Sequence, residues 1–174
     1  MCGAELHALP DTVQRVARAL QMHGHATAPL MLQDAARTAQ QAADALGVAL
    51  GQIAKSVIFR RSSGEGDTAV LVVTAGDRRV DEAKVSALAC PAGTRLHRAD
   101  ADFVKRQTGY AIGGVPPLAH AHPPVTLVDE SLFRFKTVWA AAGHPHSVFE
   151  LAPEALARYT GAPVCDVVVD VVAP

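Results

Sequence analysis

The chain has 174 residues, with 16 Lys plus Arg and 17 Asp plus Glu, which gives a formal net charge of −1 at pH 7. Hydrophobic residues make up 49% of the chain and charged residues 19%, so the composition excludes an intrinsically disordered protein. The near-neutral charge also excludes a protein that coats DNA or RNA, because that affinity comes from many Lys and Arg contacts to phosphates. We expect a single domain over residues 1–174 that touches a nucleic acid only locally or transiently.

Membrane and disulfide signals are absent from the sequence. No run of about 20 apolar residues could span a bilayer, and the N-terminal residues lack the apolar core of a signal peptide. The three cysteines, Cys2, Cys90 and Cys165, are odd in number and widely spaced, which argues against a disulfide framework. These features predict a cytoplasmic protein with no membrane partner.

Turn residues and the spacing of apolar positions divide the chain into helices and strands. Helices are expected, in chain order, over residues 11–22, 38–46, 81–89, 100–107 and 153–160, with Asp81 as an N-cap. Strands are expected over residues 29–32, 53–60, 68–74, 94–97, 125–128, 137–142, 147–151 and 164–172, with a hairpin loop over 61–67. The strand over 68–74 is apolar throughout and is expected to be buried on both faces. Helices and strands interleave, and the late strands follow one another, which predicts an α+β (mixed α/β) fold with a mixed sheet.

The segment over 109–124 is dense in glycine and proline and has little regular periodicity. Gly113 and Gly114 let the backbone approach a ligand closely, and Pro116 and Pro117 stiffen the chain behind them. A loop of about 15 residues inside a compact domain is uncommon and is usually functional. The segment is therefore predicted to bind a ligand through its backbone amides, with a plain connector as the alternative. The spacings of a Walker loop or a dinucleotide-binding loop are absent.

Lys55 is a charged residue at the start of an apolar strand. Either its alkyl stem covers the sheet while the ammonium reaches solvent, or the ammonium lies at a pocket edge and holds a phosphate or carboxylate. Other basic residues either share the rim of one pocket and hold a phosphodiester, or are ordinary solvated charges. These residues are Arg60, Arg61, Arg78, Arg79, Lys84, Lys105 and Arg106.

Metal chemistry and covalent catalysis find little support in the sequence. Two histidine pairs, His120 with His122 and His144 with His146, have no Asp, Glu or Cys at close ligand spacing, so polar roles near a pocket are expected. A Gly-x-Ser-x-Gly elbow is absent. Asp129 and its neighbour Glu130 would face opposite sides of a strand and make no carboxylate pair. The sequence predicts a site without metal or cofactor.

Four segments, taken in order, resemble the YbaK/prolyl-tRNA synthetase-associated domain family. They are residues 38–59, 72–81, 108–117 and 139–143, within a stretch of about 38–151 that covers most of the chain. The resemblance implies a single compact domain with a mixed, partly barrel-like sheet surrounded by helices. It also implies a free-standing enzyme that acts in trans and hydrolyses the ester between a wrong amino acid and tRNA, without a metal.

The resemblance also implies roles for particular residues. The family's lysine matches Lys55, and its Gly-x-x-x-Pro loop matches residues 113–117, so the amides of Gly113 and Gly114 are expected to hold the ester carbonyl. The ester is already activated, so the enzyme has to place the carbonyl, the terminal ribose and a water, and a ribose hydroxyl of the substrate assists the water. Residues expected to bind the substrate are Ser56, Pro117, Asp129, Ala141, Gly143 and His144.

The substrate implied is tRNA(Pro) carrying a small non-cognate amino acid (Ala, Cys or Ser), with prolyl-tRNA synthetase as a candidate partner. Relatives that clear cysteinyl-tRNA(Pro) carry a serine near the turn at residues 141–143, and the alanines here weaken the case for that subtype. Two other functions stay open. One is a non-catalytic module that binds aminoacyl-tRNA or a synthetase. The other is a protein that hydrolyses or binds a small aminoacyl or nucleotide ligand without tRNA.

Overall fold

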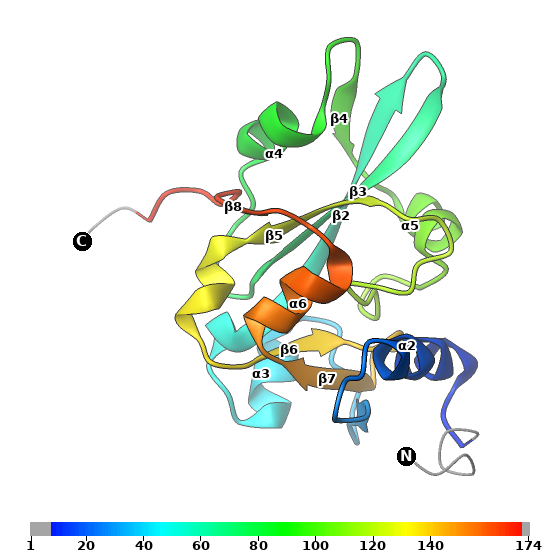
Figure 1. Ribbon diagram of the computed structural model, residues 1–174, viewed down its shortest axis with the longest axis vertical. Helices are drawn as coiled ribbons and strands as arrows, with labels where there is room; N and C mark the ends of the chain where they lie inside the picture. The colour runs from blue at the N-terminus through cyan, green and yellow to red at the C-terminus, as the bar shows by residue number, and fades with distance from the viewer. Residues whose placement is uncertain (1–7, 172–174) are drawn as a thin grey trace.

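A mixed sheet of eight strands carries the fold over residues 8–171, the part of the chain that this computed structural model describes (Figure 1). The strands are β1 (Leu30–Met31), β2 (Ile53–Ser63), β3 (Gly66–Ala75), β4 (Arg95–Arg98), β5 (Val125–Asp129), β6 (Val138–Ala141), β7 (Ser147–Leu151) and β8 (Val164–Cys165). The helices around them are α2 (Asp11–Met22), α3 (Ala39–Leu46), α4 (Glu82–Ala89), α5 (Ala101–Thr108) and α6 (Pro153–Thr160). Two 3₁₀ helices, η1 (Leu50–Gln52) and η2 (Glu130–Arg134), precede β2 and follow β5. The predicted mixed α/β class is confirmed.

The sheet has the strand order β1-β7-β6-β2-β3-β5-β8, and β4 pairs with β2 beside this path. β2 and β3 form a long antiparallel hairpin, whereas β2–β6, β3–β5 and β5–β8 are parallel pairs. In Figure 1 the β6–β7 part runs in a different direction from the β2–β3 hairpin. Among the described strands, the end strands β1 and β8 do not pair with each other. The sheet therefore curls without closing into a full barrel.

Apolar side chains pack against both faces of the central strand β3. On one face, α2, α6 and the loop over 109–124 bury the largest cluster against Leu71 and Val73. On the other face, α4 and the C-terminal segment cover Val70 and Val72. A third, smaller cluster lies under α3 around Ile53. These layers explain why the apolar strand is buried on both faces, as the sequence predicts.

The helices begin and end where capping residues predict. Thr38, Asp81 and Asp100 accept hydrogen bonds from backbone N–H groups in the first turns of α3, α4 and α5. The residue just past α3, α5 and α6 has a positive φ, which glycine adopts without steric cost; these are Gly47, Gly109 and Gly161. The helix boundaries predicted from the sequence are confirmed to within one residue.

Two expectations about strand ends are wrong. The hairpin expected as a loop over 61–67 is strand up to Ser63 and again from Gly66, because the β2–β3 ladder continues to that pair. The strand expected over 164–172 ends after Cys165, because β8 has only the end of β5 to pair with. Most of this apolar run therefore has no ladder partner, and Val172 lies outside the described residues.

The C-terminal segment after β8, residues 166–171, has no strand ladder, and local contacts fix its position instead. Val168 forms an isolated antiparallel bridge with Val80. The ammonium of Lys84 lies 2.8 Å from carboxylate oxygens of both Asp166 and Asp170. These contacts attach the segment to the start of α4.

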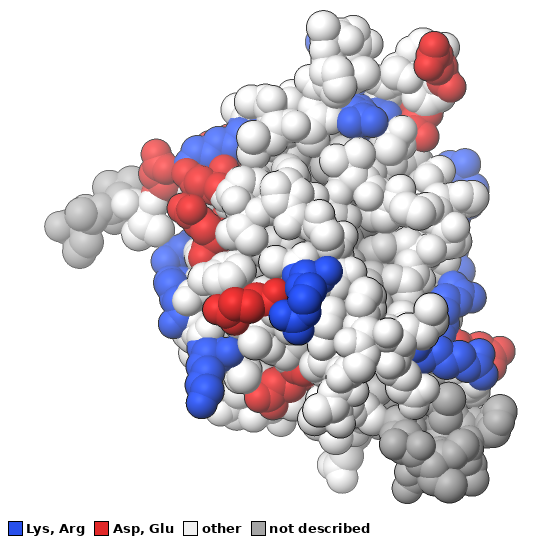
Figure 2. Space-filling view, viewed as in Figure 1, with Lys and Arg blue, Asp and Glu red and all other residues white. Residues whose placement is uncertain are grey.

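The surface carries interspersed charges and unpaired thiols. Figure 2 shows Lys and Arg side chains next to Asp and Glu side chains over the displayed face, without a large patch of one sign. Cys90 and Cys165 are free thiols, and Cys2 lies outside the described residues. Within residues 8–171 no helix is long and apolar enough to cross a membrane.

Candidate functional site

One edge of β2 has a gap in its pairing. β6 pairs with β2 only at Ile53 and Ala54, and β4 pairs with it only from Phe59 to Ser62. Residues 55–58 therefore face no strand along that edge, although β3 pairs with them on the other edge. A break of this kind exposes backbone and alternate side chains to whatever lies beside the strand.

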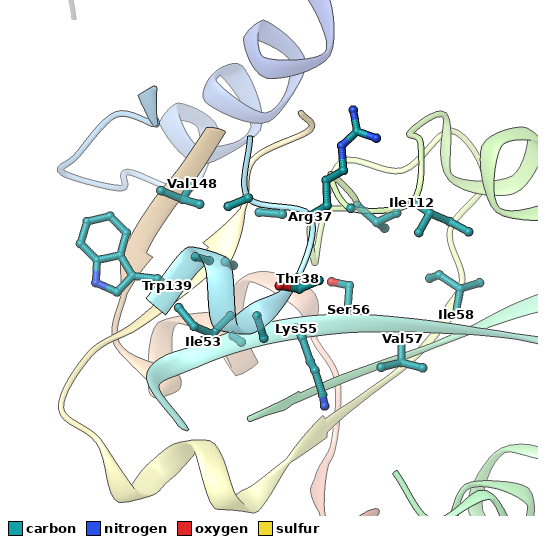
Figure 3. A pocket seen from close by; sticks show the side chains of 18 of the residues that line it. Arg37, Thr38, Ile53, Lys55, Ser56, Val57, Ile58, Ile112, Trp139 and Val148 are labelled. Carbon is teal, nitrogen blue, oxygen red and sulfur yellow. The ribbon is translucent and has the colours of Figure 1, made fainter. Parts of the chain in front are cut away.

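A pocket of about 350 Å³ opens at this gap, and we call it the gap pocket (Figure 3). Its walls come from the start of α3, the middle of β2, the loop over 112–115, and β6 and β7. The lining is mostly small and apolar, with Ala36, Ala39, Ala42, Ala54, Ala99, Ala140 and Ala141 among the residues that form it. No Asp, Glu, His or Cys of the described chain lines the gap pocket. The volume is at the lower end of the roughly 300–1,000 Å³ that is typical of small-molecule sites.

Two residues that line the gap pocket have buried hydroxyl groups without hydrogen-bond partners among the described residues. The Oγ atoms of Ser56 and Ser147 are buried, and neither bonds to another described residue. Ser147 is 0% exposed as a whole residue. Thr74 carries a third buried hydroxyl without a partner, but it does not line the pocket. Buried polar atoms are normally paired, so unpaired hydroxyls that line a pocket point to a ligand that completes them.

The two glycines predicted to hold a carbonyl have different surroundings. Gly113 lines the gap pocket with φ +92°, and its N–H donates to no other described residue. The N–H of Gly114 donates to the carbonyl oxygen of Ala111 (3.0 Å), and its own carbonyl accepts from Gly143 (2.9 Å). A Cβ on Gly114 would lie 2.9 Å from the backbone nitrogen of His144. The expectation that both amides face a substrate is therefore corrected: Gly114 is used for loop packing, and only the Gly113 amide is free.

Lys55 extends to the opposite face of β2 from Ser56, as Figure 3 shows. Its ammonium donates to the carbonyl oxygen of Arg78 (2.7 Å). Burial lowers the pKa of Lys55, and the nearby carboxylate of Asp77 partly opposes that shift. Because an ammonium has three N–H donors, two are left for a ligand. The side chain belongs to the pocket rim and its cation lies away from the Ser56 wall.

Four other predicted substrate-binding residues do not line the gap pocket: Pro117, Asp129, Gly143 and His144. Asp129 is buried, and its carboxylate accepts hydrogen bonds from the backbone N–H and hydroxyl of Ser131 at the start of η2. A ring nitrogen of His144 accepts from the backbone N–H of His146 (3.1 Å) within the turn before β7. These contacts explain the positions of Asp129 and His144 by local structure, and a role in substrate binding stays a prediction.

His120 fixes the glycine- and proline-rich loop rather than facing the gap pocket. Its Nε2–H donates to the carbonyl oxygen of Pro116 (2.7 Å), and burial lowers the pKa of its imidazole. The hydroxyl of Tyr110 donates to the carbonyl oxygen of Ala119 (2.7 Å) in the same loop. In the described chain, no three His, Cys, Asp or Glu side chains gather as metal ligands would.

Sequence reasoning assigned Lys55, Ser56, Gly113 and Ala141 to one site, and all four line the gap pocket. It missed Arg37, Thr38, Ile112 and Trp139, which also line it. Of the polar residues His144, His146 and Ser147 in the turn over 144–147, Ser147 is the one that lines the pocket. A small polar residue at the first position of a mostly apolar strand is the sequence signal for it.

Comparison with known proteins identifies the class. The sequence model of the aminoacyl-tRNA editing domain family matches residues 33–159, and the chain belongs to this family. The resemblance seen in the sequence motifs is therefore confirmed. Family membership supports aminoacyl-tRNA editing as the class of function.

Particular relatives are similar over most of the chain. The uncharacterized protein YwhH of Bacillus subtilis (strain 168) is 42% identical over 123 residues, which cover 71% of this chain and 74% of YwhH. The crystal structure of a proposed trans-editing enzyme for prolyl tRNA synthetase is 37% identical, with a TM-score of 0.82, and the match covers 93% of this chain and 99% of that one. The structure of hypothetical protein APE2540 is 34% identical with a TM-score of 0.78, over 89% of this chain and 99% of that one.

Proposed function

We propose that this protein is an aminoacyl-tRNA deacylase that acts in trans and hydrolyses the ester of mischarged tRNA(Pro). The observation that carries the proposal is the gap pocket: a small apolar cavity with two unpaired hydroxyls and one free backbone amide, in a chain of the editing family. The similar structure of a proposed trans-editing enzyme for prolyl tRNA synthetase supports that synthetase as the partner system.

The reaction needs positioning more than it needs a strong nucleophile. Water attacks the ester carbonyl carbon, the bond from that carbon to the ribose oxygen breaks, and the ribose oxygen takes up a proton. The products are the free amino acid and uncharged tRNA. The Gly113 N–H donates to the carbonyl oxygen as negative charge develops on it. The neighbouring ribose hydroxyl of the substrate directs the water, as the family resemblance implies, and no carboxylate or imidazole of the described chain lines the pocket to take that role.

The lining of the gap pocket favours a small amino acid. The alanine side chains form an apolar wall, and Ser56 and Ser147 present hydroxyls that both donate and accept. Alanine fits the apolar part, and the hydroxyl of serine or thiol of cysteine could pair with the two wall hydroxyls. A pocket separates side chains that differ by one methylene by only about 1–3 kcal/mol, so size alone gives a graded preference.

The position of the Lys55 ammonium favours a role in anchoring the 3′ end of the tRNA over contact with the ester carbonyl. Its ammonium lies on the face of β2 away from Ser56, while the residue is part of the gap-pocket lining. A cation in this position attracts the phosphate or ribose oxygens of the terminal nucleotide while the ester lies on the other side.

The alternative is a binding module of the same fold that holds aminoacyl-tRNA or a synthetase without catalysis. One observation favours it: the Gly114 amide and one Lys55 donor are already engaged in hydrogen bonds within the protein. This alternative predicts saturable binding with no loss of the ester.

The deciding experiment measures ester loss from tRNA(Pro) charged with Ala, Cys, Ser or Pro, using wild-type protein and Lys55→Ala. We expect loss of at least one non-cognate ester, sparing of prolyl-tRNA(Pro), and a rate for Lys55→Ala lower by on the order of 100-fold, because the 3′ end is no longer held in place. The melting temperature of Lys55→Ala shows that it is folded. Binding of all four tRNAs with no ester loss would establish the binding module instead.

A further inference from the structure

We propose that a second groove, at the face of β2 to which Lys55 and Val57 point, binds a phosphodiester of the RNA strand that carries the ester. This groove, the basic groove, has a volume of about 380 Å³ and is lined by Lys55, Val57, Ile58, Phe59, Arg79, Val80, Glu82, Arg98 and Ala99. The inference rests on the proposed function and names the part of the substrate that lies outside the gap pocket.

The basic groove and the gap pocket meet at the break in β2 pairing. They share Lys55, Val57, Ile58 and Ala99. Figure 3 shows Lys55 and Val57 on one side of the β2 ribbon and Ser56 and Ile58 on the other. A ligand that places its ester against Ser56 therefore has its next charged group beside Lys55, at the entrance of the basic groove.

Most basic residues noted in the sequence are already paired elsewhere. Arg60 lies 3.2 Å from Asp67, and Arg78 lies 3.3 Å from Asp77. The guanidinium of Arg61 donates to the carbonyl oxygen of Ala89 (2.6 Å). Lys84 is paired with two carboxylates at the C-terminal segment. These residues are neutralised or held by contacts within the protein.

Arg79 and Arg98 line the basic groove, whereas Arg106, which also lacks a side-chain partner among the described residues, does not. Arg79 is exposed and its side chain has no ion pair or hydrogen bond within residues 8–171. Arg98 approaches only Glu82, at 3.6 Å, and its side chain is 88% exposed. With Lys55, the groove has three cations against the single carboxylate of Glu82. This local excess of positive charge in a near-neutral protein matches a phosphate, which Arg binds through two parallel N–H donors.

The test compares the double variant Arg79→Gln/Arg98→Gln, each of the two single variants, and a control variant, Arg18→Gln. Arg18 is an exposed arginine of α2, a helix that packs on the other face of the central sheet. The probe is an uncharged RNA hairpin that ends in a single-stranded CCA. Its Kd is measured over a series of salt concentrations, beside hydrolysis of a phosphate-free aminoacyl-adenosine.

We expect the double variant to bind the hairpin about tenfold more weakly, and the slope of log K against log salt to become shallower by about 0.7, the value for one lost phosphate contact. Aminoacyl-adenosine hydrolysis and the melting temperature should match wild type, as should hairpin binding by Arg18→Gln. An unchanged Kd and slope in the double variant, or an equal loss in Arg18→Gln, would overturn the proposal.

Two further outcomes separate this proposal from others. Adenosine 5′-monophosphate that binds as tightly as the hairpin and is weakened by the same variants would assign the groove to a free nucleotide and overturn an RNA role. Hairpin binding that depends on Arg79 and Arg98, in a protein that hydrolyses no aminoacyl ester, would support the basic groove while rejecting the deacylase function.

Discussion

The buried hydroxyls give the sharpest residue-scale test of the gap pocket. An unpaired buried hydroxyl costs stability, on the order of 1–3 kcal/mol, unless a ligand completes it. Ser147 and Thr74 are both 0% exposed and unpaired, but only Ser147 lines the pocket. The two residues therefore form a matched pair in which stability and function can be separated.

We predict that Ser147→Ala keeps or raises the free energy of unfolding but lowers kcat/KM for ester hydrolysis by about tenfold, the value of one hydrogen bond of about 1.4 kcal/mol. Thr74→Val should also keep or raise stability and should leave kcat/KM at the wild-type value. Urea unfolding and initial deacylation rates measure the two quantities. A Ser147→Ala protein that is less stable yet fully active would mean that the hydroxyl serves the fold and not a substrate.

Residue chemistry could predict part of this site and not the rest. Lys55 stands out because a charge interrupts an apolar strand, and Gly113 because adjacent glycines precede two prolines. Ser147 could not be separated from His144 and His146, because the direction of each side chain depends on the turn between β6 and β7. In the structure that turn uses a ring nitrogen of His144 as an acceptor for its own backbone.

At the scale of elements, local signals predict helices better than they predict strand partners. Capping residues lie directly beside the helix ends that they stabilise, so the boundaries of a helix can be predicted from nearby residues. The gap along β2 depends on two separate partners, β6 and β4, that are distant in sequence. The valine-rich stretch after Cys165 has strong β propensity, but propensity cannot show that a partner edge is missing.

The loop over 109–124 should be sensitive to acid through His120. Burial lowers the pKa of His120 below its ordinary value of 6.5, so the unfolded chain binds the proton more readily than the folded one. The contribution of His120 to stability is therefore fully present above pH 6.5 and is lost as the pH falls through that value toward the lowered pKa. We predict that His120→Gln removes this part of the wild-type acid sensitivity, as measured by unfolding at a series of pH values.

The exposed His122 in the same loop provides the control for that experiment. His122→Gln should keep the wild-type loss of stability on acidification, because it leaves His120 and its bond to Pro116 in place. Equal acid sensitivity in wild type and His120→Gln would show that protonation of His120 does not destabilise the fold.

At the scale of the whole molecule, the family and the fold class were predictable, and the arrangement of the site was not. Motifs spread over residues 38–151 identify the editing family because their order and spacing are specific. The site depends on how the sheet curls: β6 leaves β2 after two residue pairs, and the opening that results reaches both faces of β2. We infer that this single break places the ester and the RNA backbone on opposite sides of one strand.

The most direct measurement of the central claim fills the gap pocket and follows ester loss. Ala141 lines the pocket from β6, so Ala141→Phe places a ring in the cavity. Ala87→Phe adds the same ring at an exposed position of α4. The substrate is the mischarged tRNA(Pro) that wild type hydrolyses fastest. We predict that folded Ala141→Phe hydrolyses it on the order of 100-fold more slowly, and that Ala87→Phe keeps the wild-type rate. Wild-type rates from folded Ala141→Phe would contradict the account and locate the chemistry outside the gap pocket.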